Sequence, residues 1–399
     1  MSANGIGDGS GFSMLEGIHY ATGKPVRVLV RDGVIAELEA LDYAPTDKLP
    51  WIAPGLVDLQ INGYAGDDFN TLPFTADTVV RASRALWSEG VTSYYPTVIT
   101  NSPEAIEEAV GIIAGACDRD ARTNRSIAGI HVEGPFISPE DGARGAHGLE
   151  FVRAPDWELF ERWQRAAGGR IRILTLSPEW PNSAEFIAKC AASGVTVSIG
   201  HTAATPEQIR EAVRAGARMS THLGNGAHLT LPRHPNYIWE QLAQDDLWSC
   251  VIADGFHLPE SVLKVVFRTK GAQAMMVSDA VYLCGMPPGE YETHVGGKVV
   301  LTEEGRLSLA GNPKILAGSA QMLLWGIEHV LRSGLADLTD AWEMSSVRPA
   351  RFMKLPAGDG LTAGAPADIV RFERSGDRIR VLETYKDGEL VYELEEKRI

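Results

Sequence analysis

The sequence predicts a distorted (β/α)8 TIM barrel together with a small β-sandwich domain formed from both termini. Short apolar runs alternate with amphipathic helical stretches through the middle of the chain, which is the pattern of repeated βα units and a parallel sheet. Polar residues also recur where these runs end, and a barrel of this kind builds its active site there. The residues placed in this way are Glu133, His201, His222, His257 and Asp279.

The 399 residues are enough for a barrel of about 250 to 300 residues and a smaller second domain. We expect the barrel over 54–356 and the small domain over 1–53 and 357–399. The apolar runs that we predict as barrel strands are Leu56 to Ile61, Thr92 to Val98, Ala128 to Val132, Ile171 to Leu176, Thr196 to Ile199, Met219 to Thr221, Ser249 to Ala253 and Gln273 to Val277.

The helix after His201 has the clearest start signal. Thr205 is the expected N-cap, Pro206 takes the first helical position, and Gln208 completes a capping box. After the last apolar run, the segment from Cys284 to Ser308 is rich in glycine, proline and short alternating stretches. It predicts a hairpin insertion that contributes to the pocket wall.

Both ends of the chain have the alternating pattern of half-buried strands. Residues 26–38 alternate around a turn at Asp32-Gly33, and residues 367–392 alternate with a second turn at Asp387-Gly388. We therefore expect the two ends to pair into one small β domain beside the barrel.

The formal net charge of −15 argues against partners that are nucleic acids or anionic membranes. No apolar stretch approaches the roughly 20 residues of a membrane span, and the Gly/Ser-rich start from Met1 to Gly11 lacks the pattern of a signal peptide. A cytoplasmic protein is expected. An anionic small substrate would need local cations, and Arg144, Arg233 and His257 lie in the segments that bear the motifs.

Three of the strand-end residues form a candidate metal site. Two imidazoles and a carboxylate, here His201, His222 and Glu133, are a common ligand set for zinc, with water completing the coordination. Each residue alone is as easily explained as a loop cap or a satisfied polar contact. Their recurrence at successive strand ends favours the metal.

Asp279 follows the last apolar run and is expected on the same face of the barrel as the ligands. A carboxylate there can take a proton from water and deliver it to a leaving nitrogen. The alternative is that Asp279 is a fourth metal ligand, and the sequence leaves both roles open.

Several motifs, in order along the chain, resemble the N-acetylglucosamine-6-phosphate deacetylases of the amidohydrolase superfamily. The segments that carry the resemblance are Pro54 to Gly63, His131 to Pro135, Gly145 to His147 with Phe151 to Arg153, Gly200 to Thr202, Thr221 to Asn225, Asp254 to His257, Ser278 to Ala280 and Leu316 to Ser319. The resemblance implies metal-dependent hydrolysis of the N-acetyl group of N-acetylglucosamine 6-phosphate, giving glucosamine 6-phosphate and acetate.

The resemblance also implies residue roles. Glu133, His201 and His222 would bind the metal, Asp279 would be the general base and acid, and His147 would orient or polarise the acetyl carbonyl.

The same resemblance assigns the phosphate to Asn225, the backbone at Gly226, Arg233 and His257. It implies a homodimer in which Arg233 reaches the partner's site. A solvated loop arginine is the simpler alternative for this residue.

The first strand predicts the number of metal ions. Many amidohydrolases carry a His-x-His pair where this chain has Gln60 and Asn62. Amides are poor metal ligands, and the Gln-x-Asn form resembles that of single-metal deacetylases. The resemblance therefore implies that Gln60 and Asn62 are vestigial metal positions and that one divalent ion is bound, with zinc favoured over iron or another transition metal.

The segment from Gly224 to His228 departs from the usual family pattern, in which an aromatic residue precedes Asn-Ala-Met. The change leaves open a related activity on N-acetylgalactosamine 6-phosphate or on an unphosphorylated sugar. An amidohydrolase for cyclic amides or N-acyl amino acids is disfavoured by Arg233 and His257. A non-catalytic barrel that serves as a scaffold is disfavoured by the complete set of ligands and base.

Overall fold

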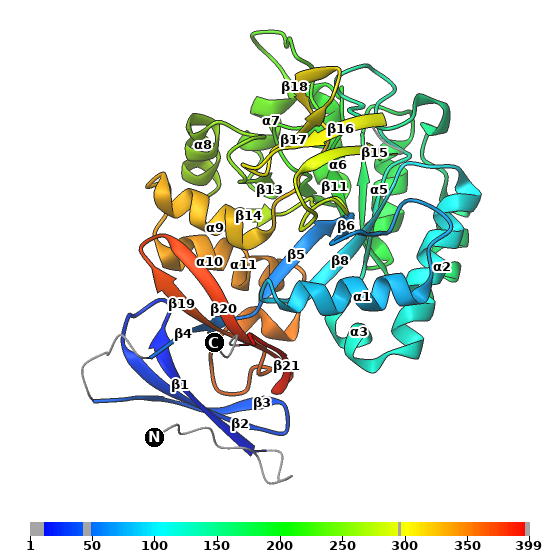
Figure 1. Ribbon diagram of the computed structural model, residues 1–399. Helices are drawn as coiled ribbons and strands as arrows, with labels where there is room; N and C mark the ends of the chain where they lie inside the picture. The colour runs from blue at the N-terminus through cyan, green and yellow to red at the C-terminus, as the bar shows by residue number, and fades with distance from the viewer. Residues whose placement is uncertain (1–11, 43–48, 294–296, 396–399) are drawn as a thin grey trace. The chain divides into compact units, whose positions relative to one another are not determined.

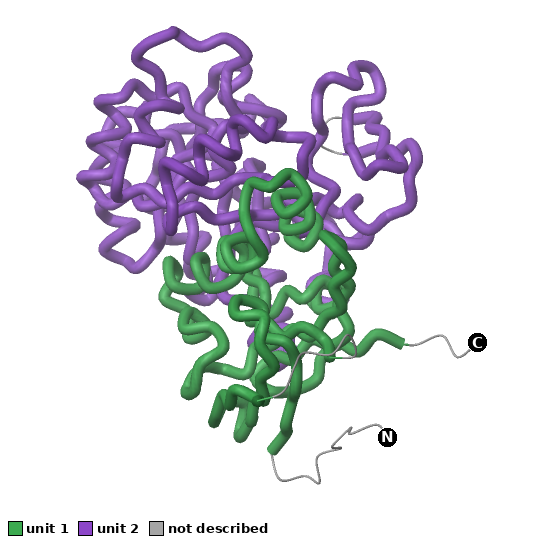
Figure 2. The backbone as a smooth tube through the Cα atoms, turned by 90° about the vertical axis from the view of Figure 1, so that its left-hand side faces the viewer, with its two compact units in different colours: residues 1–58, 83–94, 323–399 green, residues 59–82, 95–322 purple. Residues whose placement is uncertain are grey.

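The computed structural model describes residues 12–42, 49–293 and 297–395 (Figure 1). The predicted Gly/Ser-rich start lies outside these residues. The chain divides into two compact units, one made of 1–58, 83–94 and 323–399 and the other of 59–82 and 95–322 (Figure 2). The domain boundaries expected from the sequence stay predictions.

An eight-stranded sheet forms the barrel, and its strands lie side by side in the order of the sequence. Neighbouring strands from β8 to β14 are parallel. A bridge between Ile61 and Ala280 brings the first strand next to the residues that follow the last, so the barrel is nearly closed, as predicted. The strands are β5 (Leu56–Ile61), β8 (Val91–Ile99), β9 (Ile130–Glu133), β10 (Ile171–Leu176), β11 (Thr196–Ile199), β12 (Ala217–Ser220), β13 (Trp248–Ile252) and β14 (Ala274–Val277).

Helices connect successive barrel strands. The predicted start of α6 is confirmed, with Thr205 as N-cap, Pro206 at the first position and a capping box to Gln208. Within the described ranges, no helix is both long enough and apolar enough to cross a bilayer. The helices are α1 (Ala76–Trp87), α2 (Pro103–Arg119), α3 (Ala121–Ser126), α4 (Trp157–Ala166), α5 (Ser183–Ala192), α6 (Pro206–Ala215), α7 (Tyr237–Ala243) and α8 (Glu260–Lys270), with 3-10 turns η1 (Leu149–Phe151) and η2 (Gly271–Gln273).

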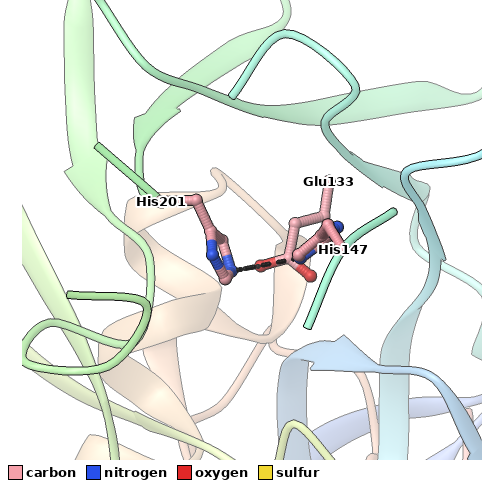
Figure 3. Close-up of side chains that lie close together, drawn as sticks. All are labelled: Glu133, His147 and His201. Atoms are coloured by element: carbon pink, nitrogen blue, oxygen red, sulfur yellow. Dashed lines mark hydrogen bonds and ion pairs between the residues drawn. The ribbon is translucent and has the colours of Figure 1, made fainter. Parts of the chain in front are cut away.

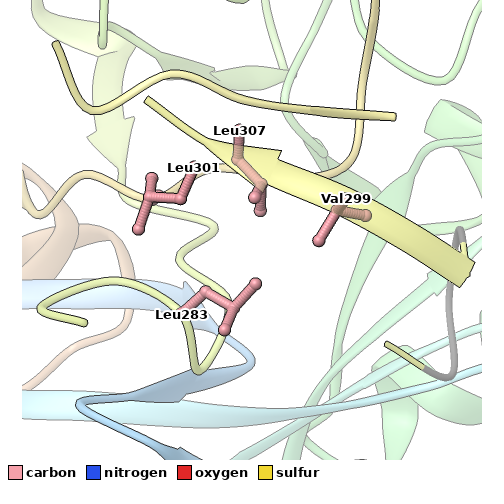
Figure 4. Packing of buried hydrophobic residues seen from close by; sticks show 5 residues of the cluster. Leu283, Val299, Leu301 and Leu307 are labelled. Carbon is pink, nitrogen blue, oxygen red and sulfur yellow. The ribbon is translucent and has the colours of Figure 1, made fainter. Parts of the chain in front are cut away.

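The insertion after β14 is a four-stranded antiparallel sheet. It extends further along the chain than the predicted hairpin and ends at Leu316. Leu283 packs against Val299, Leu301 and Leu307 of this sheet and gives the insertion an apolar core of its own (Figure 4). Its strands are β15 (Gly289–Thr293), β16 (Gly297–Leu301), β17 (Leu307–Leu309) and β18 (Asn312–Leu316), and a short ribbon of β6 (Gly63–Tyr64) and β7 (Asp67–Asp68) follows β5.

A seven-stranded sheet built from both ends of the chain confirms the predicted pairing of the two ends. Its order is β21-β20-β19-β4-β1-β2-β3. Its strands are β1 (Phe12–His19), β2 (Pro25–Arg31), β3 (Val34–Ala40), β4 (Trp51–Pro54), β19 (Ile369–Ser375), β20 (Arg378–Lys386) and β21 (Glu389–Glu393). The same unit contains α9 (Leu323–Arg332), α10 (Leu338–Met344), α11 (Val347–Phe352) and the 3-10 turn η3 (Pro356–Asp359).

A chain of hydrogen bonds runs between strands inside the barrel. The buried His131 ring in β9 contacts the Leu59 carbonyl at 3.0 Å through Nδ1 and the Thr175 hydroxyl at 2.7 Å through Nε2. Thr175 in turn contacts Thr221, and Thr221 contacts Ser198. Burial lowers the pKa of His131 to about 4, so the ring is neutral, with the Nδ1 proton directed at the carbonyl. This network satisfies polar groups that would otherwise be buried without partners.

Trp342 offers a test of the core of the terminal unit. Its ring stacks on Phe372 with centroids 4.7 Å apart, and its indole N–H donates to the Pro54 carbonyl at 2.8 Å. We expect Trp342→Ala to lower the free energy of unfolding by about 3–5 kcal/mol, because it leaves a cavity and an unpaired carbonyl. Phe12→Ala, at a side chain 42% exposed in the same unit, should cost about 0.5 kcal/mol or less. Denaturant unfolding followed by circular dichroism measures both, and equal losses would contradict this view of the core.

Candidate active site

The ends of the barrel strands position the predicted site residues. Glu133 is the last residue of β9, while His201, His222 and Asp279 each come two residues after a strand. These last three all have left-handed backbones, with φ of 47°, 26° and 47°. A non-glycine residue in this conformation is strained, and such strain is concentrated at functional sites.

Four side chains converge in the barrel mouth. Oε1 of Glu133 lies 3.0 Å from Nε2 of His222 and 3.3 Å from Nε2 of His201, and the two histidine Nε2 atoms are 3.1 Å apart. His147, from the loop after β9, places its Nε2 3.3 Å from that of His201. All four residues are buried. Figure 3 shows His147 and His201 directed toward the Glu133 carboxylate.

The donor set fits a tetrahedral metal. Metal–ligand bonds of about 2.0–2.1 Å in a tetrahedron give edges of about 3.3–3.4 Å, close to the separations between Glu133, His201 and His222. Nδ1 of His201 lies 3.1 Å from the Ala143 carbonyl, so its proton is held there and Nε2 offers a lone pair. Glu133, His147 and His201 also satisfy the spacing of a metal group, so two overlapping triads share Glu133 and His201.

Electrostatics within the cluster favour an ionised carboxylate. Burial alone would raise the pKa of Glu133, but hydrogen bonds and charge from His201 and His222 hold it well below its usual value. Burial likewise opposes protonation of His222, and the neighbouring Glu133 outweighs it, raising the pKa of His222 to about 8. Burial and the nearby His201 lower the pKa of His147 to about 3, so this ring is neutral.

The pKa of Asp279 is shifted in the opposite direction to that of Glu133. Burial and the negative charge of Glu133 raise its pKa to about 6, which is suited to a group that both accepts and returns a proton near neutral pH. The Asn62 amide donates to Oδ1 of Asp279 at 2.8 Å. The Gln60 amide donates to Oε1 of Glu133 at 3.0 Å. The two first-strand amides therefore hold the carboxylates of the site, a contact that the sequence did not indicate.

A pocket of about 490 Å³ opens onto this cluster. Of the residues expected to bind phosphate, Asn225, Gly226 and His257 line it, while Arg233 lies exposed and outside the lining. Nδ1 of His257 is 2.7 Å from Asp254, and this imidazole outweighs the effect of burial and keeps the pKa of Asp254 low. The ring orientation of His257 is thereby fixed.

The pocket wall also contains residues that sequence reasoning missed. Asp68 and Asn70 line it from the segment after β5, and Tyr282, Arg306 and Lys314 line it from the segment after β14. The predicted role of the insertion in the pocket wall is confirmed. Its alternating pattern gave a signal for strands but not for which side chains face the pocket.

Comparisons with known proteins identify the family. The model of the amidohydrolase family matches residues 51–391. An N-acetylglucosamine-6-phosphate deacetylase from Lysinibacillus sphaericus is 32% identical over 86% of this chain and 88% of its own, and an N-acetylgalactosamine-6-phosphate deacetylase from Shewanella is 31% identical over 92% of each. The crystal structure of N-acetyl-D-glucosamine-6-phosphate deacetylase from Mycobacterium smegmatis has a TM-score of 0.83 at 27% identity, covering 95% of this chain and 100% of its own. The chain therefore belongs to the amidohydrolase family, a family of metal-dependent hydrolases.

Proposed function

We propose that this protein hydrolyses the N-acetyl group of N-acetylglucosamine 6-phosphate to give glucosamine 6-phosphate and acetate. The observation that carries the proposal is the convergence of Glu133, His201 and His222 beside Asp279 in one pocket. The relatives that bear the name N-acetylglucosamine-6-phosphate deacetylase support the choice of substrate. The Shewanella relative supports a second candidate, the galactosamine epimer.

Glu133, His201 and His222 are the proposed ligands of one divalent metal, with zinc favoured by the nitrogen and carboxylate donors. Oε1 of Glu133 and the Nε2 atoms of His201 and His222 lie 3.0–3.3 Å from one another and form a closed triangle. Nε2 of His147 lies 3.3 Å from Nε2 of His201. When bound, a divalent metal supplies Lewis acidity, which polarises the amide carbonyl and makes water more acidic.

Asp279 moves the proton in the proposed reaction. Its carboxylate takes a proton from the attacking water as the oxygen bonds to the acetyl carbon. It then gives the proton to the sugar nitrogen as the C–N bond breaks, which yields acetic acid and the free amine. The acid then loses its proton to solvent or to the amine and leaves as acetate. The Asn62 amide holds the Asp279 carboxylate in place at 2.8 Å.

His147 is the proposed donor to the acetyl oxygen. Because its pKa is low, the ring is neutral and carries one N–H. His147 lines the pocket, and its Nε2 lies 3.3 Å from Nε2 of His201, so the ring is beside the proposed metal ligands. A donor here stabilises the negative charge that develops on the carbonyl oxygen. We also propose a homodimer in which Arg233, exposed and outside the lining of its own pocket, reaches the phosphate in the partner's site.

Acetate release tests the function directly. Purified protein should turn over N-acetylglucosamine 6-phosphate, and Asp279→Asn should lower kcat by about 10²- to 10⁴-fold, because the proton carrier is lost. The galactosamine epimer and unphosphorylated N-acetylglucosamine serve as comparison substrates. Faster turnover of the epimer would move the proposal to the second candidate, and no turnover of any of the three by metal-loaded protein would refute it.

Metal content distinguishes the two overlapping triads. His222→Asn should reduce bound zinc from about one ion per chain to a small fraction, because it removes a ligand. His147→Asn should keep the zinc and lose kcat. Elemental analysis after exhaustive dialysis measures the content, and retention by His222→Asn with loss by His147→Asn would assign His147 as the ligand instead.

The pH dependence of kcat/KM tests the role of Asp279. The group must be deprotonated to act as a base, so kcat/KM should fall as the pH drops through about 6. The Asn62 amide stabilises the charged carboxylate, so Asn62→Leu should raise the pKa of Asp279 and move this limb to higher pH. A limb that stays in place, or moves to lower pH, would contradict the assignment.

A further inference from the structure

β10 lies between two strands that position proposed metal ligands. Its neighbours in the sheet are β9, which ends at Glu133, and β11, which precedes His201. Three residues after β10 comes Glu179, which is half-buried and lies outside the lining of the pocket. Its carboxylate is hydrogen-bonded to the loops that follow both neighbouring strands. Glu179 can therefore influence the site through the backbone, without touching the substrate.

The Glu179 carboxylate accepts three hydrogen bonds. The Ser138 hydroxyl donates to Oε1 at 3.0 Å, while the Ser177 hydroxyl and the Ala203 N–H donate to Oε2 at 2.6 and 2.8 Å. Both serines are buried. A carboxylate suits this place because it offers two acceptor oxygens, and hydrogen bonds to a charged acceptor are stronger than those to a neutral one. One side chain thus joins the loops after β9, β10 and β11.

The joined loops hold the backbone around His201 on both sides. The Ser138 N–H donates to the His201 carbonyl at 2.8 Å. The Thr202 hydroxyl lies 2.8 Å from the Ser177 hydroxyl and is the donor there, because the Ser177 hydrogen is given to the carboxylate. His201 has a φ of 47°, and a left-handed conformation of this kind persists only where the surrounding structure holds it. This network supplies that support.

We propose that Glu179 is a positioning residue for the metal site, holding the His201 backbone in the conformation that directs its imidazole at the other ligands. This inference rests on the proposed function, from which the metal ligands are taken. Nε2 of His201 lies 3.3 Å from Oε1 of Glu133 and 3.1 Å from Nε2 of His222. Because the imidazole is carried by a strained backbone, relaxation of residue 201 toward an ordinary φ would move this nitrogen away from the other two donors.

Zinc affinity tests the inference without relying on turnover. In Glu179→Ala, the zinc dissociation constant, measured by competition with a chromophoric chelator, should rise about 10- to 100-fold, as is typical when a group that orients a metal ligand is lost. Glu179→Gln should stay within about threefold of the wild type, because its amide oxygen still accepts from residues 177 and 203 and its amide nitrogen can donate to the Ser138 hydroxyl. Glu185→Ala is the matched control, since this carboxylate lies on α5, is 69% exposed and pairs with Lys189.

Ser177→Ala is a milder version of the same change. It removes one donor to Glu179 together with the partner of the Thr202 hydroxyl, and it should raise the zinc dissociation constant about two- to tenfold. The visible absorption spectrum of cobalt-substituted Glu179→Ala should differ from that of the wild type, because the geometry of the ligands around the ion changes. Glu179→Gln and Glu185→Ala should keep the wild-type spectrum.

Circular dichroism of the metal-free proteins shows whether each variant is folded. Folded Glu179→Ala and Ser177→Ala with wild-type zinc affinity and spectrum would overturn the inference and leave the proposed function intact. So would a lower unfolding midpoint in Glu179→Ala without a change in zinc affinity, which is the result of a purely structural role. A wild-type protein that binds zinc but releases no acetate would instead refute the proposed function, and the zinc measurements would still decide the role of Glu179.

Discussion

The ionised carboxylate of Glu133, only 3% exposed, sets the main constraint on the barrel mouth. A buried charge is tolerated only when groups of opposite sign or good donors surround it. His201, His222 and the Gln60 amide meet that requirement from three other strands or strand ends. The arrangement keeps the imidazole nitrogens and a carboxylate oxygen close together, so the same contacts that satisfy Glu133 also create a compact set of donors.

Backbone strain accompanies this arrangement. The left-handed conformations of His201, His222 and Asp279 cost about 1–3 kcal/mol each, and they persist only where the surrounding structure holds them. The fully buried strands β9 and β14 supply that rigid support, together with His131 of β9, which is hydrogen-bonded to β5 and β10. The packing energy of the barrel thus offsets the local cost of turning these three side chains into the pocket.

Local patterns were sufficient to predict much of this architecture. Each apolar run corresponds to an observed barrel strand, with ends that differ by at most two residues, because periodicity and burial act over short stretches. The strand-end rule also anticipated that Glu133, His201 and His222 would meet. It could not show that Gln60 holds Glu133 or that Asn62 holds Asp279, since these partners are 73 and 217 residues apart and depend on barrel closure.

The insertion sheet separates two tasks along the chain. In the proposed reaction, bond cleavage depends mainly on residues at the ends of barrel strands, whereas residues 289–316 form a wall with an apolar core of its own. A segment that packs largely on itself can be exchanged as a cassette without disturbing the groups that break the bond. Redesign of this wall, with neutral or acidic side chains facing the pocket, offers a route to deacetylases for acylated amines of other charge.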